Sequence, residues 1–324
     1  MNVDELNVDL VRFKKRKPVK VGMYLIFTLL GLYGGVFLSL NLLQSHPLIL
    51  IATVPMTTIG MCLSYVLLHD CGHKSLFAKP NWNQGVGHIM GFGILIPHSL
   101  WQFIHDAHHK NVGNLEQRAF NPEIWTLTKK EYQETGMLKR LAYRFMRSRW
   151  TRFTLTPTVN LGLMFRLVSK KFSWAANISV IIHDILYVVL VLILLKYYTG
   201  FELIMSIYLP LVLFYFIASY TFYAQHQFEN TYWEHEQQWN YQKASFYGAS
   251  CIEAPLWFRF LTGNVVYHNL HHLQSGIPFY QLHDAHQELK RHYGYQTYGL
   301  SEIWDMLDCK LWDEELKKLV PYPD

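Results

Sequence analysis

Three short windows of the chain are dense in histidine. Eight of the seventeen histidines fall within residues 69–73, 105–109 and 268–272. Inside each window they stand three or four residues apart or side by side, so on a helix they share one face. Neutral imidazole is the most common protein ligand for transition metals such as iron, zinc and copper. The pattern therefore predicts metal binding by His69, His73, His105, His108, His109, His268, His271 and His272.

The number of imidazoles favours two metal ions over one. A single ion takes roughly four to six ligands, so eight imidazoles suit a pair of ions with positions left open for oxygen or substrate. An isolated histidine on a helix is usually a surface or core residue. Three windows with HxxxH, HxxHH and HxxHH spacing in one chain are not explained in that way.

The composition indicates a membrane protein with a large polar part. Of 324 residues, 51% are hydrophobic and 16% are charged, whereas a soluble chain carries about 25% charged residues. The mean hydropathy of +0.05 is too low for a chain made of spans alone. The four cysteines, at positions 62, 71, 251 and 309, form no CxxC motif, and we expect the last three to stay reduced.

Four apolar segments are long enough to cross a bilayer, which takes about 20 helical residues. They are 21–43, 48–68, 178–198 and 203–224, joined in pairs by the turns 44–47 and 199–202. We expect Pro210 to kink the fourth span, and we interpret His183 and Asp184 as a pair near the membrane interface. The predicted fold is an all-helical integral membrane protein with two helical hairpins. A helical cap built from 69–177 and 225–324 would hold the metals, with 85–104 as an interfacial or re-entrant segment.

Basic residues set the predicted orientation. Between residues 105 and 177 there are thirteen Lys/Arg and five Asp/Glu, and both hairpin turns lack Lys and Arg. The positive-inside rule therefore places both termini and the histidine windows in the cytoplasm. Segment 129–152 mixes basic and aromatic residues. Nucleic acid can bind such a patch, but beside a membrane it indicates a helix lying on anionic headgroups.

The windows and their flanking residues resemble the membrane fatty acid desaturase family over nearly the whole chain. Residues 222–229 (FYAQHQFE), 261–272 (LTGNVVYHNLHH), 277–280, 141–144 and 311–314 are similar to bacterial acyl-lipid desaturases. The HDAHH window and the Pro97-His98-Ser99 lead-in point to the delta-12 (omega-6) type. The LTGN stretch also fits the delta-5 type.

The resemblance implies one fatty acid desaturase domain, residues 1–324, in a bacterial inner membrane. It implies a centre of two iron ions held by the eight window histidines, with His226 as a ninth ligand, and O2 as co-substrate. Asp70 and Asp106 stand beside ligands and can orient them, or can cap helices or pair with lysines. Asn264 can hold a metal-bound water. We expect His88 and His98 not to be ligands, and His283, His286 and His292 to lie on the surface.

The implied reaction places a cis double bond in a long acyl chain, carried by a membrane lipid, CoA or acyl-carrier protein. The chain has no flavin or nicotinamide fingerprint and no His-Pro-Gly-Gly signature of cytochrome b5. Electrons would therefore come from a separate ferredoxin, flavodoxin or cytochrome b5.

Two kinds of alternative remain open on the sequence alone. A hydroxylase or ketolase of the same histidine-rich group has similar windows. A zinc-dependent membrane hydrolase or a metal transporter fits less well. Zinc sites use three or four protein ligands, fewer than the eight histidines here. A transporter needs polar residues through its spans, but segments 21–43 and 48–68 contain no charged residue.

Overall fold

A computed structural model describes residues 9–118, 126–155, 158–159 and 162–323. The chain is mostly helical and clusters into two compact units. One unit comprises residues 16–103 and 154–218, and we call it the span unit. The other comprises 1–15, 104–153 and 219–324, and we call it the histidine unit. Each unit is described by itself below.

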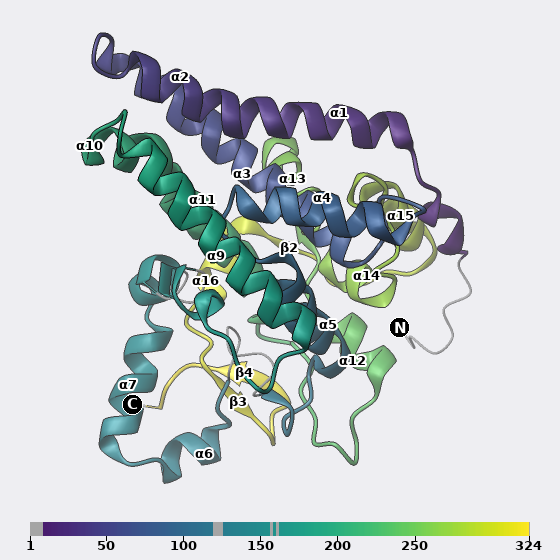
Figure 1. The fold of residues 1–324 in the computed structure, drawn as a ribbon. Helices are drawn as coiled ribbons and strands as arrows, with labels where there is room; N and C mark the ends of the chain where they lie inside the picture. The colour runs from purple at the N-terminus through teal and green to yellow at the C-terminus, as the bar shows by residue number, and fades with distance from the viewer. Residues whose placement is uncertain (1–8, 119–125, 156–157, 160–161, 324) are drawn as a thin grey trace. The chain divides into compact units, whose positions relative to one another are not determined.

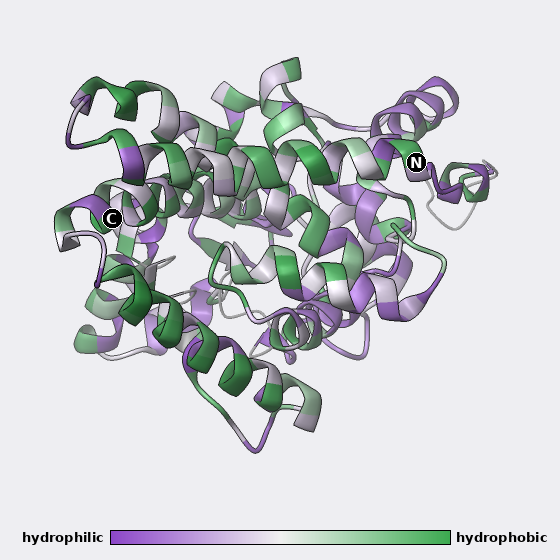
Figure 2. Ribbon diagram, turned by 45° about the horizontal axis from the view of Figure 1, so that its top comes forward, coloured by the Kyte–Doolittle hydropathy of each residue, from purple (hydrophilic) through white to green (hydrophobic). Residues whose placement is uncertain are grey.

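Four helical segments are long and apolar enough to cross a membrane. They are Pro18–Leu42, Pro47–Gly72, Trp174–Leu194 and Gly200–His226, and their ends lie within about one helical turn of the four predicted spans. The second span helix continues through Gly72, so His69 stands in its last turn. Figure 2 shows the hydrophobic colour concentrated on long helices, while the segment beside the N-terminus is hydrophilic.

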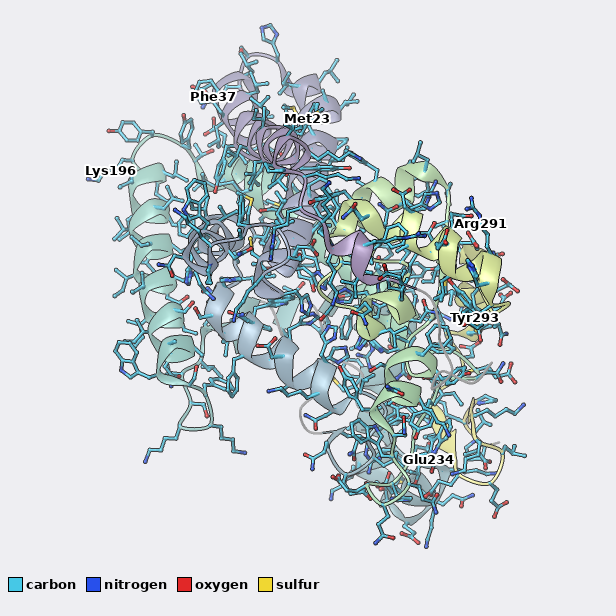
Figure 3. All side chains as sticks on the ribbon, turned by 90° about the vertical axis from the view of Figure 1, so that its right-hand side faces the viewer. Met23, Phe37, Lys196, Glu234, Arg291 and Tyr293 are labelled. Carbon is cyan, nitrogen blue, oxygen red and sulfur yellow. The ribbon has the colours of Figure 1, made fainter. Side chains whose placement is uncertain are left out.

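The first hairpin is held by close backbone packing. Helix α1 (Pro18–Leu29), the π-helical η3 (Leu30–Gly34) and α2 (Gly35–Leu42) form one continuous rod (Figure 1). The chain returns through η4 (Pro47–Ile49) and α3 (Leu50–Gly72). A Cβ atom on Gly60 would lie 2.2 Å from the backbone nitrogen of Leu32, so α3 can approach η3 only with glycine there. Met23 and Phe37 project outward from the rod (Figure 3), and both are exposed.

Two helices follow the first hairpin. Helix α4 (Pro80–Phe92) packs along α3, where the Ser64 hydroxyl donates to the Met90 carbonyl at 2.8 Å. Helix α5 (His98–Asn111) comes next. The interfacial or re-entrant placement of 85–104 stays a prediction. His98 is fully buried beside His88, and burial together with that neighbour lowers the pKa of His98 to about 3.

The second hairpin consists of α9 (Trp174–Leu194), α10 (Gly200–Leu203), the π-helical η9 (Ile204–Tyr208) and α11 (Leu209–His226). Thr199 and Glu202 cap its returning helix reciprocally. Pro210, where we expected a kink, stands in the first turn of α11 directly after the π-helical stretch, and it supplies no backbone donor.

A partly buried charge network joins the third span helix to the loop before it. The His183–Asp184 pair is present, with Nδ1 and Oδ1 3.6 Å apart. A third member was not predicted: Arg166, at the end of η8 (Met164–Arg166), lies 2.8 Å from His183 and 2.7 Å from Asp184. Its other nitrogen donates to the Leu95 carbonyl at 2.6 Å. Arg166 therefore contacts both members of the pair, while the Nε2 atom of His183 makes no hydrogen bond among the described residues.

The histidine unit is built from short elements around an apolar core. The core includes Leu270, Ile277, Leu282, Leu289 and Ile303, all fully buried. Two small sheets complete it, with β1 parallel to β2 and β3 antiparallel to β4. The elements are η2 (Val11–Lys14), α6 (Lys129–Glu134), α7 (Met137–Arg147), η7 (Thr151–Leu155), α12 (Tyr241–Tyr247), β1 (Ile252–Glu253), α13 (Leu256–Leu261), α14 (His268–Leu273), α15 (Phe279–His292), β2 (Tyr298–Gly299), α16 (Leu300–Met306), β3 (Leu311–Asp313) and β4 (Lys318–Val320).

Candidate metal centre

The second histidine window forms the last turns of α5. His105, His108 and His109 stand at positions i, i+3 and i+4 of this helix, so their rings project from neighbouring turns. All three are less than 9% exposed. The helical spacing read from the sequence is therefore the spacing that the structure uses.

The third window is helix α14, which a tight turn positions. Gly263 and Asn264 both have positive φ angles, of 58° and 57°, and turn the chain sharply before the helix. The backbone N–H groups of His268 and Asn269 then both donate to the Ser250 carbonyl at 3.1 Å. These contacts satisfy two donors that a helix N-terminus leaves unpaired. His268, His271 and His272 are all buried as a result.

Four histidines converge in the histidine unit. Their ligand nitrogens lie within 4.8 Å of one another. The Nε2 atom of His268 is 3.0 Å from that of His226 and 3.1 Å from that of His272. The Nε2 atom of His108 is 3.3 Å from that of His272. We call His108, His226, His268 and His272 the four-histidine group; they come from α5, α11 and α14.

A second set of imidazoles also converges in this unit. The Nε2 atom of His109 lies 3.1 Å from that of His105 and 3.2 Å from that of His271. These three nitrogens also lie within 4.8 Å of one another. We call His105, His109 and His271 the three-histidine group. Helices α5 and α14 therefore each contribute to both groups, as the HxxHH spacing allows.

The first window lies in the span unit. His69 and His73 are one turn apart at the end of α3, and their ring centroids are 4.8 Å apart. The Nδ1 atom of His69 lies 3.2 Å from the Asp70 carboxylate, which can only accept, so the other nitrogen is left with its lone pair. The rings of Tyr65 and Trp101 contact His69.

The donor set of the four-histidine group fits a metal ion. The Nδ1 atom of His226 donates to the Gly248 carbonyl at 3.1 Å, which fixes the tautomer and leaves the lone pair of Nε2 facing the other rings. Burial lowers the pKa of His272 well below its usual range, and the neighbouring imidazoles lower it further. Neutral imidazoles that face each other through Nε2 cannot satisfy one another fully. A bound cation does satisfy them.

The residues expected to orient the ligands lie in different places. Asp70 is buried against His69, as described above. Asp106 is exposed on α5. The Asn264 side chain donates to the Phe279 carbonyl at 3.3 Å, and its backbone carbonyl accepts from Tyr267. Asn264 therefore forms part of the turn before α14.

One surface prediction is wrong. His292 is exposed and His283 is half-buried, but His286 is fully buried. It lies 2.5 Å from the Tyr295 hydroxyl, 3.5 Å from Cys251 Sγ and 3.4 Å from a Glu253 oxygen. Its ring stacks on Tyr267 with centroids 4.1 Å apart. We call these residues the His286 cluster. His286 was predicted to lie on the surface because the sequence of α15 is polar, but one face of this amphipathic helix packs into the core.

Several residues that build the site were not identified from the sequence. The Gly248 and Ser250 carbonyls, which hold His226 and α14, are invisible in a side-chain pattern. Phe222 covers the four-histidine group, with its ring 5.5 Å from His108 and 5.2 Å from His226. Its signal was available, since an aromatic residue four positions before a histidine on a helix lies against it. Tyr65 stands in the same relation to His69.

Comparison with known proteins agrees with this arrangement. A family model described as "Fatty acid desaturase" matches residues 45–304. The chain is 29% identical over 319 residues to "Fatty acid desaturase" of Bacillus subtilis, covering 98% of this chain and 90% of the relative. It is 25% identical over 271 residues to the "sn-1 oleoyl-lipid 12-desaturase" of a Picosynechococcus species, covering 78% and 73%. It is 24% identical over 262 residues to "Omega-6 fatty acid desaturase, chloroplastic" of Glycine max, covering 78% and 60%.

Proposed function

The chain belongs to the fatty acid desaturase family and is an oxidoreductase of the membrane, and we propose that it introduces a cis double bond into the acyl chain of a membrane lipid at a centre of two iron ions. The observation that carries the proposal is the convergence of four buried imidazoles in the histidine unit. The family model matches most of the chain, and this match supports desaturation as the reaction at that site.

We propose nine iron ligands. The four-histidine group would hold one ion. The three-histidine group would hold the other, together with His69 and His73 from the end of α3. The HxxxH spacing and the Asp70 contact of His69 support these last two ligands. Seven of the nine side chains are supplied by α5, α11 and α14.

Iron with O2 would supply an oxidant strong enough to remove hydrogen from an unactivated CH2–CH2 unit. The chain's own residues do the rest. Gly248 and Asp70 each hold an imidazole in one tautomer through its Nδ1 atom. Phe222 and the buried core keep water from the rings, which protects them from protonation. Overall, one CH2–CH2 unit, O2, two electrons and two protons give CH=CH and two waters.

The two electrons would come from an external one-electron carrier, which we propose is a ferredoxin, flavodoxin or cytochrome b5. A relative from Synechocystis is named "sn-1 acyl-lipid omega-3 desaturase (ferredoxin)", which supports a ferredoxin. The 12-desaturase relatives support a delta-12 position on a lipid-bound acyl chain. We also propose that both termini and the histidine windows face the cytoplasm, on the distribution of Lys and Arg.

The test is the acyl-chain profile of a bacterial host with simple fatty acids, which expresses the chain together with a ferredoxin and its reductase. We expect a new unsaturated chain by gas chromatography–mass spectrometry, and its double-bond position reports the regiospecificity. The His271→Ala variant should lose it, whereas the matched His292→Ala variant, changed at an exposed histidine, should keep it. A hydroxylated or keto product would move the chain to the alternative reaction. A desaturated product that persists in His271→Ala would remove that ligand from the site.

A further inference from the structure

Helix α7 turns an apolar face outward. Leu138, Leu141 and Phe145 stand at positions i, i+3 and i+7, so they form one stripe along the helix. Their exposed fractions are 79%, 56% and 58%. Met137 and Met146 flank the stripe and are also exposed. Large apolar side chains gathered on one exposed face mark a surface that contacts another apolar phase.

The arginines of the same helix have partners within the protein, although only Arg147 is buried. Arg147 is 1% exposed and donates to the Gln227 amide oxygen at 2.5 Å. Arg144 donates to the Tyr132 hydroxyl at 2.6 Å, and its guanidinium lies over the Tyr322 ring. Arg140 donates to the Thr135 carbonyl at 2.7 Å. Three cations of this helix therefore each have a partner within the protein.

The expectation that the basic segment lies on anionic headgroups stays a prediction, and part of its positive charge already has partners within the protein. The side chain of Arg149 also pairs within the protein, with Asp308 at 2.9 Å. Lys139 remains exposed at the edge of the helix. What the helix offers to its surroundings is therefore mainly apolar area, with a little positive charge beside it.

We propose that α7 (Figure 1) is a membrane-surface helix, which lies in the plane of one leaflet and buries the Leu138–Leu141–Phe145 stripe at the boundary of headgroups and acyl chains. Two observations favour a bilayer as the occupant over a protein. Trp150, the residue type that prefers this boundary, is 82% exposed just beyond the helix. Leu155, Leu163 and Trp174, further along the chain, are also exposed, and Trp174 begins a helix that is long and apolar enough to cross a membrane. Insertion driven by apolar area needs no anionic lipid.

The experiment measures depth at single labelled positions in the full-length chain. A Cys309→Ser background removes the cysteine that is not buried. Leu138→Cys, Leu141→Cys and Phe145→Cys then each carry a nitroxide label on α7. Gln287→Cys, at an exposed position of α15 among charged residues, is the matched control. The protein is reconstituted, without any electron carrier, in vesicles of phosphatidylcholine alone and of phosphatidylcholine with phosphatidylglycerol at three to one.

We expect the three α7 labels to be reached by O2 and shielded from a water-soluble nickel chelate, with a ratio several-fold above that at Gln287→Cys, in both kinds of vesicle. Equal access of the chelate to α7 and to α15 would overturn the proposal. Protection in the phosphatidylglycerol vesicles alone would replace apolar insertion by adsorption through charge. Shielding from both reagents, with spin–spin broadening between labels, would mean that a second copy of the chain covers the face. Retained desaturase activity in each labelled variant verifies that it is folded.

Discussion

Two buried histidine clusters in the same unit surround their imidazole nitrogens with different kinds of partner. In the four-histidine group, Nε2 atoms face other Nε2 atoms at 3.0–3.3 Å. In the His286 cluster, one imidazole faces a phenol, a thiol and a carboxylate. In the second cluster the partners are polar groups of the protein, while the Nε2 atom of His286 makes no hydrogen bond among the described residues. In the first cluster the rings offer nitrogens to one another, which suits the cation that we propose there, and this difference separates a proposed metal site from a structural network.

The largest expected effect comes from changing the first cluster. His226→Ala removes the imidazole that Gly248 orients, so the variant should lose iron and lower desaturation by about 100-fold or more. Iron content and product are measured on the same preparation. Full iron with normal product would exclude His226 from the ligands. His292→Ala, at an exposed position, should match the unmodified protein in both measurements.

The same substitution in the second cluster should lower stability without changing iron content. His286→Ala removes the imidazole that Tyr295 and Cys251 contact and opens a cavity, which should cost about 2–3 kcal/mol of stability. For a chain of 324 residues, that corresponds to a fall of roughly 3–5 °C in the Tm of the detergent-solubilised protein. Iron content should stay the same. A variant that loses iron as fully as His226→Ala would break the comparison.

The pH dependence of stability should also report on His286. Burial is the largest cause that lowers its pKa, to about 4, while an unfolded histidine titrates near about 6.5. Below that value the unfolded state binds the proton more readily, so this stabilisation is complete above pH ~6.5 and is lost as the pH falls toward ~4. The charged or titratable groups nearest to the ring are Cys251, Glu253, Tyr267, His283, Lys290 and Tyr295.

His286→Gln is the variant that isolates this contribution, because it keeps polar atoms at the position but cannot titrate. Its Tm should fall less steeply than that of the unmodified protein between pH 6.5 and 4. Parallel curves would assign the acid sensitivity to other groups. The comparison is made at equal iron content, since metal binding also depends on pH.

The smallest effect is expected at the rim of the His286 cluster. Lys290 pairs with Glu253 at 2.6 Å, but both side chains are more than 40% exposed. Exposed ion pairs contribute little, so Lys290→Ala should change stability by about 0.5 kcal/mol or less. Thermal unfolding at low and high salt measures it. A loss as large as that of His286→Ala would mean that the carboxylate, rather than the imidazole, organises the cluster.

The spacing of residues along the sequence predicted those features that depend only on nearby residues in the chain. The spans follow from run length, and the histidine windows follow from helix geometry. His286 and Arg166 were misjudged or missed because their partners, Cys251 and Asp184 among them, belong to other elements. For α7, the helical period separates an apolar from a basic face. It does not say which face packs inward, since that depends on Gln227, Tyr132 and Tyr322.

The proposed ligands of the four-histidine group are far apart along the chain, so the ribosome synthesises them at different times. His108 and His272 are separated by 164 residues, and His226 and His268 by 42. On a ribosome that adds about 5–20 residues per second, the last ligands therefore emerge several seconds after α11 is complete. Until then the nascent chain holds at most part of each set, and premature termination before α14 yields a membrane-inserted product with incomplete sites. Loading of the proposed metal centre would thus be a late step of biogenesis, which the order of the helices along the chain places after synthesis of the four candidate spans.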